Sequence, residues 1–130
     1  MVLFGDPVIQ QEKFYHISDI DTIVHTPPNS IIYLPYTKEN LDIITYAQQN
    51  HIRMALEAHS IQAIIYAHNL GANYIVVNEH LAKDAQKIAE NYLFDAKIIV
   101  LCDNASMIET MALLGVDGVL FPNGIVKISS

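Results

Sequence analysis

Short apolar runs and longer amphipathic stretches alternate along most of the chain. The apolar runs from residue 31 onward are IIYLPY, MALEA, YIVV, IIVLC and GVLF, and their centres recur about every 20 to 24 residues. Between them, apolar residues are spaced three and four apart, which is the period of an amphipathic helix. Apolar runs without polar alternation are typical of parallel strands that helices cover. The pattern therefore predicts repeated βα units and an α/β fold.

Capping residues set the expected limits of the helices. Ser60 is suited to the position before a helix, and Gly71 to the left-handed position after one. Gly115 has the same role two units later, before the similar phrase GVDGVLF. Helices are predicted over residues 39–49, 61–70, about 81–92, and from about 104 to 114.

Residues 1–30 follow a different pattern. Two short apolar runs, VLF and FYHI, flank Gly5-Asp6-Pro7, which has turn chemistry, so we expect a short N-terminal β hairpin or two short edge strands. A short helix follows, and Pro27 ends it. We therefore expect one α/β domain over residues 1–130, with βα repeats in 31–130 and a mostly parallel sheet of five or six strands. An open doubly wound sheet and a half-barrel both fit the pattern.

Composition and charge narrow the classes of partner. Hydrophobic residues make up 52% of the 130 residues, which favours a buried core. The formal net charge of -7 disfavours nucleic acid and anionic membrane surfaces. No apolar run approaches the roughly 20 residues that span a bilayer. A single cysteine, Cys102, excludes an intrachain disulfide and favours a cytoplasmic location. The predicted open sheet edge favours self-association, most simply as a homodimer.

The residues that follow each predicted strand form the candidate site, because parallel α/β sheets bind ligands beyond the carboxyl ends of their strands. Three interpretations of these polar residues stay open, namely helix caps with solvated loops, a general acid–base site, and a mixed nitrogen and oxygen metal site. No Walker or dinucleotide-binding glycine motif is present in the sequence, and no cofactor is indicated. The catalytic candidates are Glu57, Glu79 and Asp103, the ligand-binding candidates are Thr37, Lys38, Ser60, Asn78, Asn104, Asn123 and Gly124, and the metal-ligand candidates are His59 and His80.

The last repeat reads GVDGVLFPNGI from Gly115 to Ile125. The stretch from Arg53 to Ile125, a little over half of the chain, resembles the later βα units of phosphate-binding TIM barrels. The similar groups are the orotidine phosphate decarboxylase-like and keto-deoxy-phosphogluconate aldolase-like barrels. In them, backbone N–H groups after a late strand bind a phosphate. The resemblance implies that Asn123 and Gly124 have this role here.

Two functions are expected from these observations. The first is binding of a small anionic, phosphate-bearing ligand, or of a protein partner, at the carboxyl ends of the strands. The alternative is a lyase, isomerase or hydrolase that acts on a phosphorylated metabolite. In that case a carboxylate among the catalytic candidates would be the acid or base, with a metal ion as one version of the site.

Overall fold

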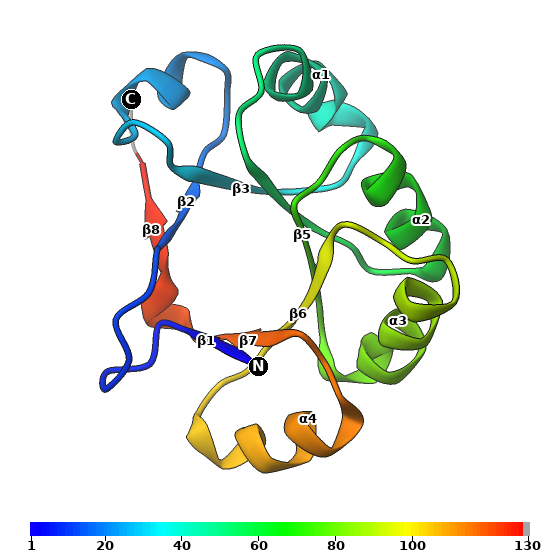
Figure 1. Cartoon of the computed structure of the whole chain (residues 1–130). Helices are drawn as coiled ribbons and strands as arrows, with labels where there is room; N and C mark the ends of the chain where they lie inside the picture. The colour runs from blue at the N-terminus through cyan, green and yellow to red at the C-terminus, as the bar shows by residue number, and fades with distance from the viewer. Residues whose placement is uncertain (129–130) are drawn as a thin grey trace.

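The computed structural model describes residues 1–128, in which eight β-strands form one curled sheet (Figure 1). The strands follow the order β1-β7-β6-β5-β4-β3-β2-β8, and every neighbouring pair is parallel. The predicted α/β class is therefore confirmed. The strands are β1 (Val2–Phe4), β2 (Phe14–His16), β3 (Ile31–Pro35), β4 (Met54–Glu57), β5 (Tyr74–Val77), β6 (Lys97–Leu101), β7 (Gly118–Leu120) and β8 (Ile125–Lys127).

The N-terminal strands pair differently from the prediction. β1 pairs with β7, and β2 lies between β3 and β8, so the predicted hairpin is wrong. The prediction of five or six strands is also too low, because β1, β2 and β8 all join the parallel sheet. Phe4 and Phe14 explain this arrangement, since they are only 2% and 0% exposed. An isolated hairpin cannot bury two such side chains, whereas a curled sheet can.

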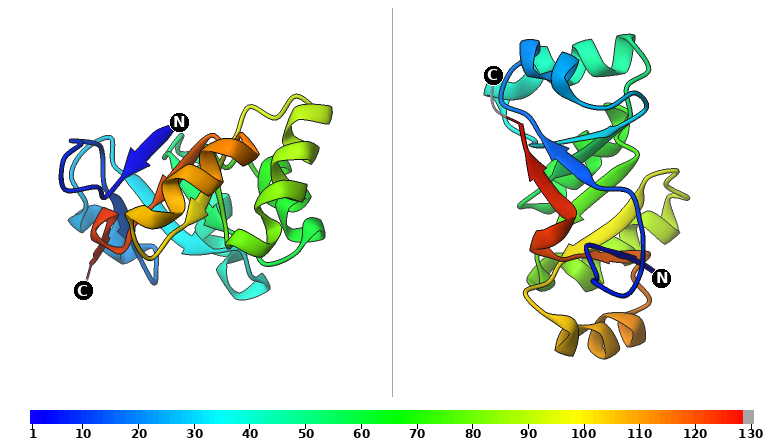
Figure 2. Two further views of the ribbon diagram at one scale, coloured as in Figure 1. Left: turned by 90° about the horizontal axis from the view of Figure 1, so that it is seen from below. Right: turned by 90° about the vertical axis from the view of Figure 1, so that its left-hand side faces the viewer.

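The sheet curls into a half-barrel with its helices on the outer face (Figures 1 and 2). A doubly wound sheet would need helices on both faces. Here the inner face instead buries side chains from different strands against one another. Of the two predicted arrangements of the sheet, the chain thus adopts the half-barrel. The buried inner cluster consists of Phe4, Phe14, Ile31, Tyr33, Ala55, Val76, Ile99 and Leu120.

The two ends of the strand order come close together beside β1 and β8. Gly5 directly follows β1 and has a φ of +82°. A Cβ atom added to Gly5 would lie 2.4 Å from the backbone nitrogen of Gly124, which directly precedes β8. Phe121 N–H also donates to the carbonyl of Phe4 over 2.9 Å. Because β1 and β8 are three-residue strands, the sheet edges that favoured self-association are short.

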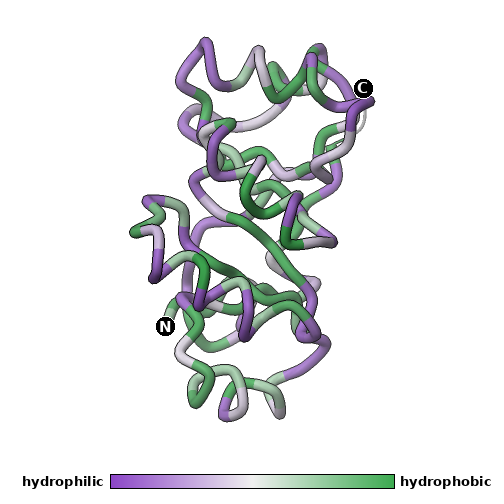
Figure 3. Tube along the Cα trace, turned by 90° about the vertical axis from the view of Figure 1, so that its right-hand side faces the viewer, coloured by the Kyte–Doolittle hydropathy of each residue, from purple (hydrophilic) through white to green (hydrophobic). Residues whose placement is uncertain are grey.

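The helices follow the capping signals closely. Ser60 accepts a hydrogen bond from Ala63 N–H at the start of α2, and Gly115 ends α4 with a φ of 81°. Hydrophobic and hydrophilic positions alternate along the helices, as Figure 3 shows from their side of the molecule. Among residues 1–128, no helix has the length and apolar character to cross a membrane. The α-helices are α1 (Leu41–Gln49), α2 (Ile61–Asn69), α3 (Glu79–Asn91) and α4 (Ile108–Leu114), and the 3-10 helices are η1 (Asp21–His25), η2 (Lys38–Asn40), η3 (Ala105–Met107) and η4 (Pro122–Gly124).

Candidate functional site

The carboxyl ends of the parallel strands lie at one edge of the sheet, here called the rim. All the candidate residues lie on it or next to it, because Glu57 ends β4 and each of the others lies within four residues after the end of β3, β4, β5, β6 or β7. Their positions within the rim differ, however, because the sheet is curled. The rim therefore divides into separate local environments.

Three candidate ligand-binding residues on the rim cap the helices that they precede. The hydroxyl of Ser60 accepts from Ala63 N–H over 3.1 Å. The side-chain oxygen of Asn78 accepts from Leu81 N–H over 3.3 Å. The corresponding oxygen of Asn104 accepts from the N–H of the residue two positions later over 3.0 Å. These contacts belong to the first of the three interpretations, and they occupy oxygens that a ligand would otherwise use.

Glu57 is held between two side chains at the end of β4. It lies two residues after Ala55, an inner-face residue, so alternation directs it to the inside of the curl. Tyr33 pairs with Ala55 in the ladder, and its hydroxyl donates to Oε2 of Glu57. Nε2 of His59 lies 2.7 Å from Oε1 of Glu57. Both carboxylate oxygens of Glu57 therefore have a partner, which fixes the orientation of the carboxylate.

Tyr33 is suited to positioning Glu57 rather than to proton transfer. Its side chain is 4% exposed. Burial, and then the hydrogen bond and the charge of Glu57, raise the pKa of the Tyr33 hydroxyl well above its usual value of 10.0. The phenol thus remains a hydrogen-bond donor throughout the neutral pH range. The ring of His16 packs edge-on against the Tyr33 ring, with centroids 5.7 Å apart.

A cavity of about 600 Å³ lies beside this group and is here called the β3–β4 cavity. Lys38 is exposed on its wall, and the rings of Tyr36 and Tyr66 stack with centroids 5.9 Å apart. Tyr36 N–H donates to the carbonyl of Glu57 over 2.8 Å, which links the cavity wall to the end of β4. Thr37 precedes η2 without a capping hydrogen bond from its side chain. The cavity is lined by Tyr36, Lys38, Leu41, Ser60, Gln62, Ala63 and Tyr66.

A second cavity, of about 410 Å³, lies at the ends of β1, β6 and β7 and is here called the acidic cavity. Asp103, Asn104 and Asn123 line it together with Asp6 from the segment after β1. Two carboxylates in one cavity repel an anion. The N–H of Gly124 already donates to the carbonyl of Phe121 over 2.9 Å, and Gly124 is buried. The phosphate role that the resemblance implies for Asn123 and Gly124 therefore lacks a free donor at Gly124.

Glu79 and His80 lie apart from these groups. Both are exposed in the first turn of α3. Among residues 1–128, no three histidine, cysteine, aspartate or glutamate side chains gather in a way that could hold a metal ion. His59 and His80 thus form no metal centre with their acidic neighbours in the described chain. Burial, with smaller effects from Glu79 and Asp103, raises the pKa of the Cys102 thiol to about 11, which makes it a poor nucleophile.

Sequence reasoning did not include Tyr33, Tyr36 and Tyr66 in the site. One signal could have linked Tyr33 to Glu57, because both occupy inward positions on adjacent strands. The register that places them together is, however, a property of the folded sheet.

Comparison with known proteins gives no match to a protein-family model and none to a curated protein sequence. The resemblance of residues 53–125 to phosphate-binding TIM barrels stays a prediction. The functional assignment consequently depends on the chemistry of the rim.

Proposed function

We propose that this protein binds a small anionic metabolite in the β3–β4 cavity. The observation that carries the proposal is the presence of a lysine and two tyrosine rings in one cavity of about 600 Å³. Cavities of this size accommodate ligands as large as a sugar phosphate or a nucleotide. Lys38 is the one lysine or arginine among the candidate residues, so the anionic group of the ligand is assigned to its side.

The rest of the cavity supports the same class of ligand. The amino end of α2 borders it at Ser60 and Gln62, and a helix amino end favours negative charge. Tyr36 and Tyr66 offer apolar ring surface for the uncharged part of the ligand. The acidic cavity, with Asp6 and Asp103, is unsuited to an anion. An anionic ligand is therefore directed toward Lys38.

Substitution of Lys38 by methionine tests the proposal. We expect a panel of sugar phosphates and nucleotides, screened by thermal shift, to contain a ligand that stabilises the wild-type chain. A ligand at 100 times its Kd should add roughly 2.7 kcal/mol to the free energy of unfolding. Lys38→Met should weaken binding by about tenfold or more, because it removes a charge-assisted contact.

The matched control for this change is Lys83→Met. Lys83 is exposed on α3, away from the cavity residues, and its substitution changes the net charge equally. Binding that Lys83→Met weakens as much as Lys38→Met would reflect the overall charge rather than the cavity. If no phosphorylated compound in the panel stabilises the wild-type chain, the proposal fails.

Acid–base catalysis at the rim is a second candidate function. It is favoured by the carboxylate of Glu57, whose two oxygens Tyr33 and His59 hold in one orientation on the inside of the curl. A carboxylate held in one orientation can act as the general acid or base of a lyase, isomerase or hydrolase. Self-association stays a prediction that light scattering would test.

Glu57→Gln separates catalysis from binding. The amide keeps the shape of the side chain but cannot accept a proton. For a ligand identified in the panel, we expect turnover to fall by roughly 100-fold or more, while its Kd changes little. Nuclear magnetic resonance of the ligand, recorded over time with each variant, measures both quantities. Unchanged turnover in Glu57→Gln, or none in the wild-type chain, would exclude this second function.

A further inference from the structure

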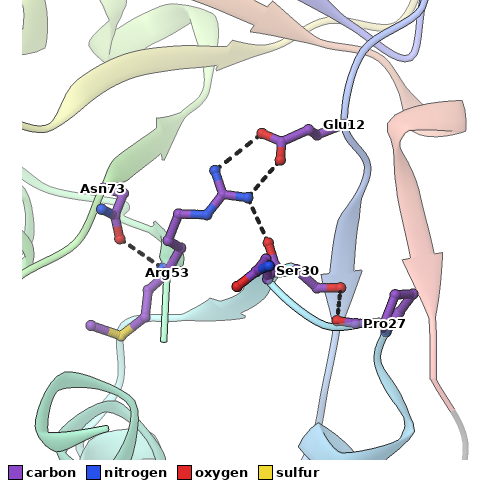
Figure 4. Close-up of polar contacts among 7 residues, drawn as sticks. Glu12, Pro27, Ser30, Arg53 and Asn73 are labelled. Carbon is purple, nitrogen blue, oxygen red and sulfur yellow. Dashed lines mark hydrogen bonds and ion pairs between the residues drawn. The ribbon is translucent and has the colours of Figure 1, made fainter. Parts of the chain in front are cut away.

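Arg53 lies at the opposite end of the sheet from the rim, directly before β4. Figure 4 shows its contacts with Glu12. Arg53 is the one arginine in the sequence. Its Nη2 lies 2.5 Å from Oε1 of Glu12, and its Nη1 lies 3.1 Å from Oε2. Nη2 also donates to the carbonyl of Asn29 over 2.6 Å. The guanidinium thus binds a carboxylate with two parallel hydrogen bonds, the geometry in which arginine recognises carboxylates and phosphates.

Two cavities border Arg53 on the amino-terminal face. One has a volume of about 300 Å³ and the other about 410 Å³, and His51, Ile52 and Arg53 line both. The smaller cavity also contains Gln48 and Asn73. The side chain of Arg53 is 35% exposed, so an ion from solvent can reach it. Arg53 therefore lies beside open space whose walls are partly polar and partly apolar.

The carboxylate that occupies Arg53 belongs to an exposed segment. Glu12 lies between β1 and β2 in residues 5–13, which contain no helix or strand, and its side chain is 51% exposed. Every residue from 7 to 13 is exposed. Such a segment has few packing contacts that would oppose a movement of Glu12 away from Arg53.

We propose that Arg53 is an anion-binding site and that Glu12 occupies it in this structure as an internal carboxylate. The ligand is an oxyanion, either a carboxylate or a phosphate, that would replace Glu12 on the same two guanidinium nitrogens. Both members of the pair carry their charge at neutral pH. The hydrogen bond to Arg53 lowers the pKa of Glu12 below its usual 4.5, and the bond to Glu12 raises the pKa of Arg53. This inference is independent of the function proposed for the rim.

How strongly Glu12 competes with an external anion for Arg53 depends on how exposed the Glu12–Arg53 ion pair is. In an exposed ion pair, the population with the two side chains in contact exceeds the population with them apart by no more than about fivefold. The apparent affinity of an external anion is reduced by the fraction of molecules in which Arg53 is free. Removal of Glu12 should therefore tighten anion binding by up to about fivefold.

The test is titration with inorganic phosphate and, separately, with acetate at constant ionic strength. The Nε–H signal of Arg53 in a ¹H–¹⁵N spectrum reports binding directly, because no other arginine contributes to that region. We expect Glu12→Ala to bind at least one of the two anions about fivefold more tightly than the wild-type chain. Whichever anion responds identifies the preferred group.

Two further variants separate an effect at Arg53 from a change in net charge. Glu90→Ala removes an equal charge from an exposed position on α3, and the anion affinity measured at the Arg53 signal should equal that of the wild-type chain. The double variant Glu12→Ala, Arg53→Gln should lose the gain in anion affinity that Glu12→Ala gives. Because this variant lacks the Arg53 signal, its affinity is measured by thermal shift. If Glu12→Ala does not fold, Glu12→Gln replaces it. The inference is overturned if freeing Arg53 gives no tighter binding of either anion, in which case Glu12 and Arg53 only tie the segment to the sheet.

Discussion

Gly5→Ala is expected to lower the free energy of unfolding by about 2–5 kcal/mol, adding left-handed backbone strain to overpacking. The added Cβ would lie 2.4 Å from the nitrogen of Gly124 and 2.9 Å from the carbonyl oxygen of Phe121. Both are backbone atoms, which cannot move aside as a flexible side chain can. Urea denaturation followed by circular dichroism measures the change.

Gly115→Ala is the matched control for this prediction. Its φ of +81° is close to that of Gly5, but no atom lies within 4 Å of an added Cβ. It should therefore cost only the conformational strain, about 1–2 kcal/mol. The difference between the two variants isolates the contact between Gly5 and Gly124. Equal losses in both would mean that the two ends of the sheet do not meet as closely as the structure shows.

Phe14→Ala is expected to lower the free energy of unfolding by about 3–5 kcal/mol, the usual cost of removing a buried phenylalanine ring. Phe14 is 0% exposed, and its ring lies 4.8 Å from the Phe4 ring and 5.3 Å from the Tyr74 ring. These contacts join β1, β2 and β5 across the inside of the curl. The same denaturation experiment measures the loss.

Tyr15→Ala is the control because Tyr15 is the next residue in β2 and points to the opposite face. Tyr15 is only partly buried, so its removal should cost clearly less. A loss for Phe14→Ala no greater than that for Tyr15→Ala would contradict the curled sheet. It would instead agree with the hairpin that the sequence predicted for this region.

The candidate site was predictable in its location but not in its composition. The carboxyl ends of parallel strands lie at one edge of the sheet, so Lys38, Glu57 and Asp103 were correctly expected on the rim. Ser60 and Asn78 turned out to cap helices, a role that serine and asparagine favour at the position before a helix. Neither local pattern nor residue type separates these two roles.

Long-range pairs could not be predicted from the sequence pattern. Tyr33 reaches Glu57 only because β3 and β4 pair in one particular register. Glu12 reaches Arg53 only because the segment before β2 passes the start of β4. A shift of one residue in the β3–β4 ladder would turn the side chains of one strand to the other face and separate Tyr33 from Glu57. The geometry of both proposed sites is therefore tertiary.

The sequence alone predicts the helices and the strands from β3 to β7, because their apolar periods and capping residues act over a few neighbouring positions. It also predicts the parallel α/β class, since fully apolar strands need cover on both faces. The curl, the parallel pairing of β1, β2 and β8, and the partners of Glu57 and Arg53 came instead from the fold of the whole chain. The runs VLF and FYHI indicate strands in the sequence, but such short strands carry too little local signal to fix their partners. Their pairing follows from burying Phe4 and Phe14 against residues distant in the chain.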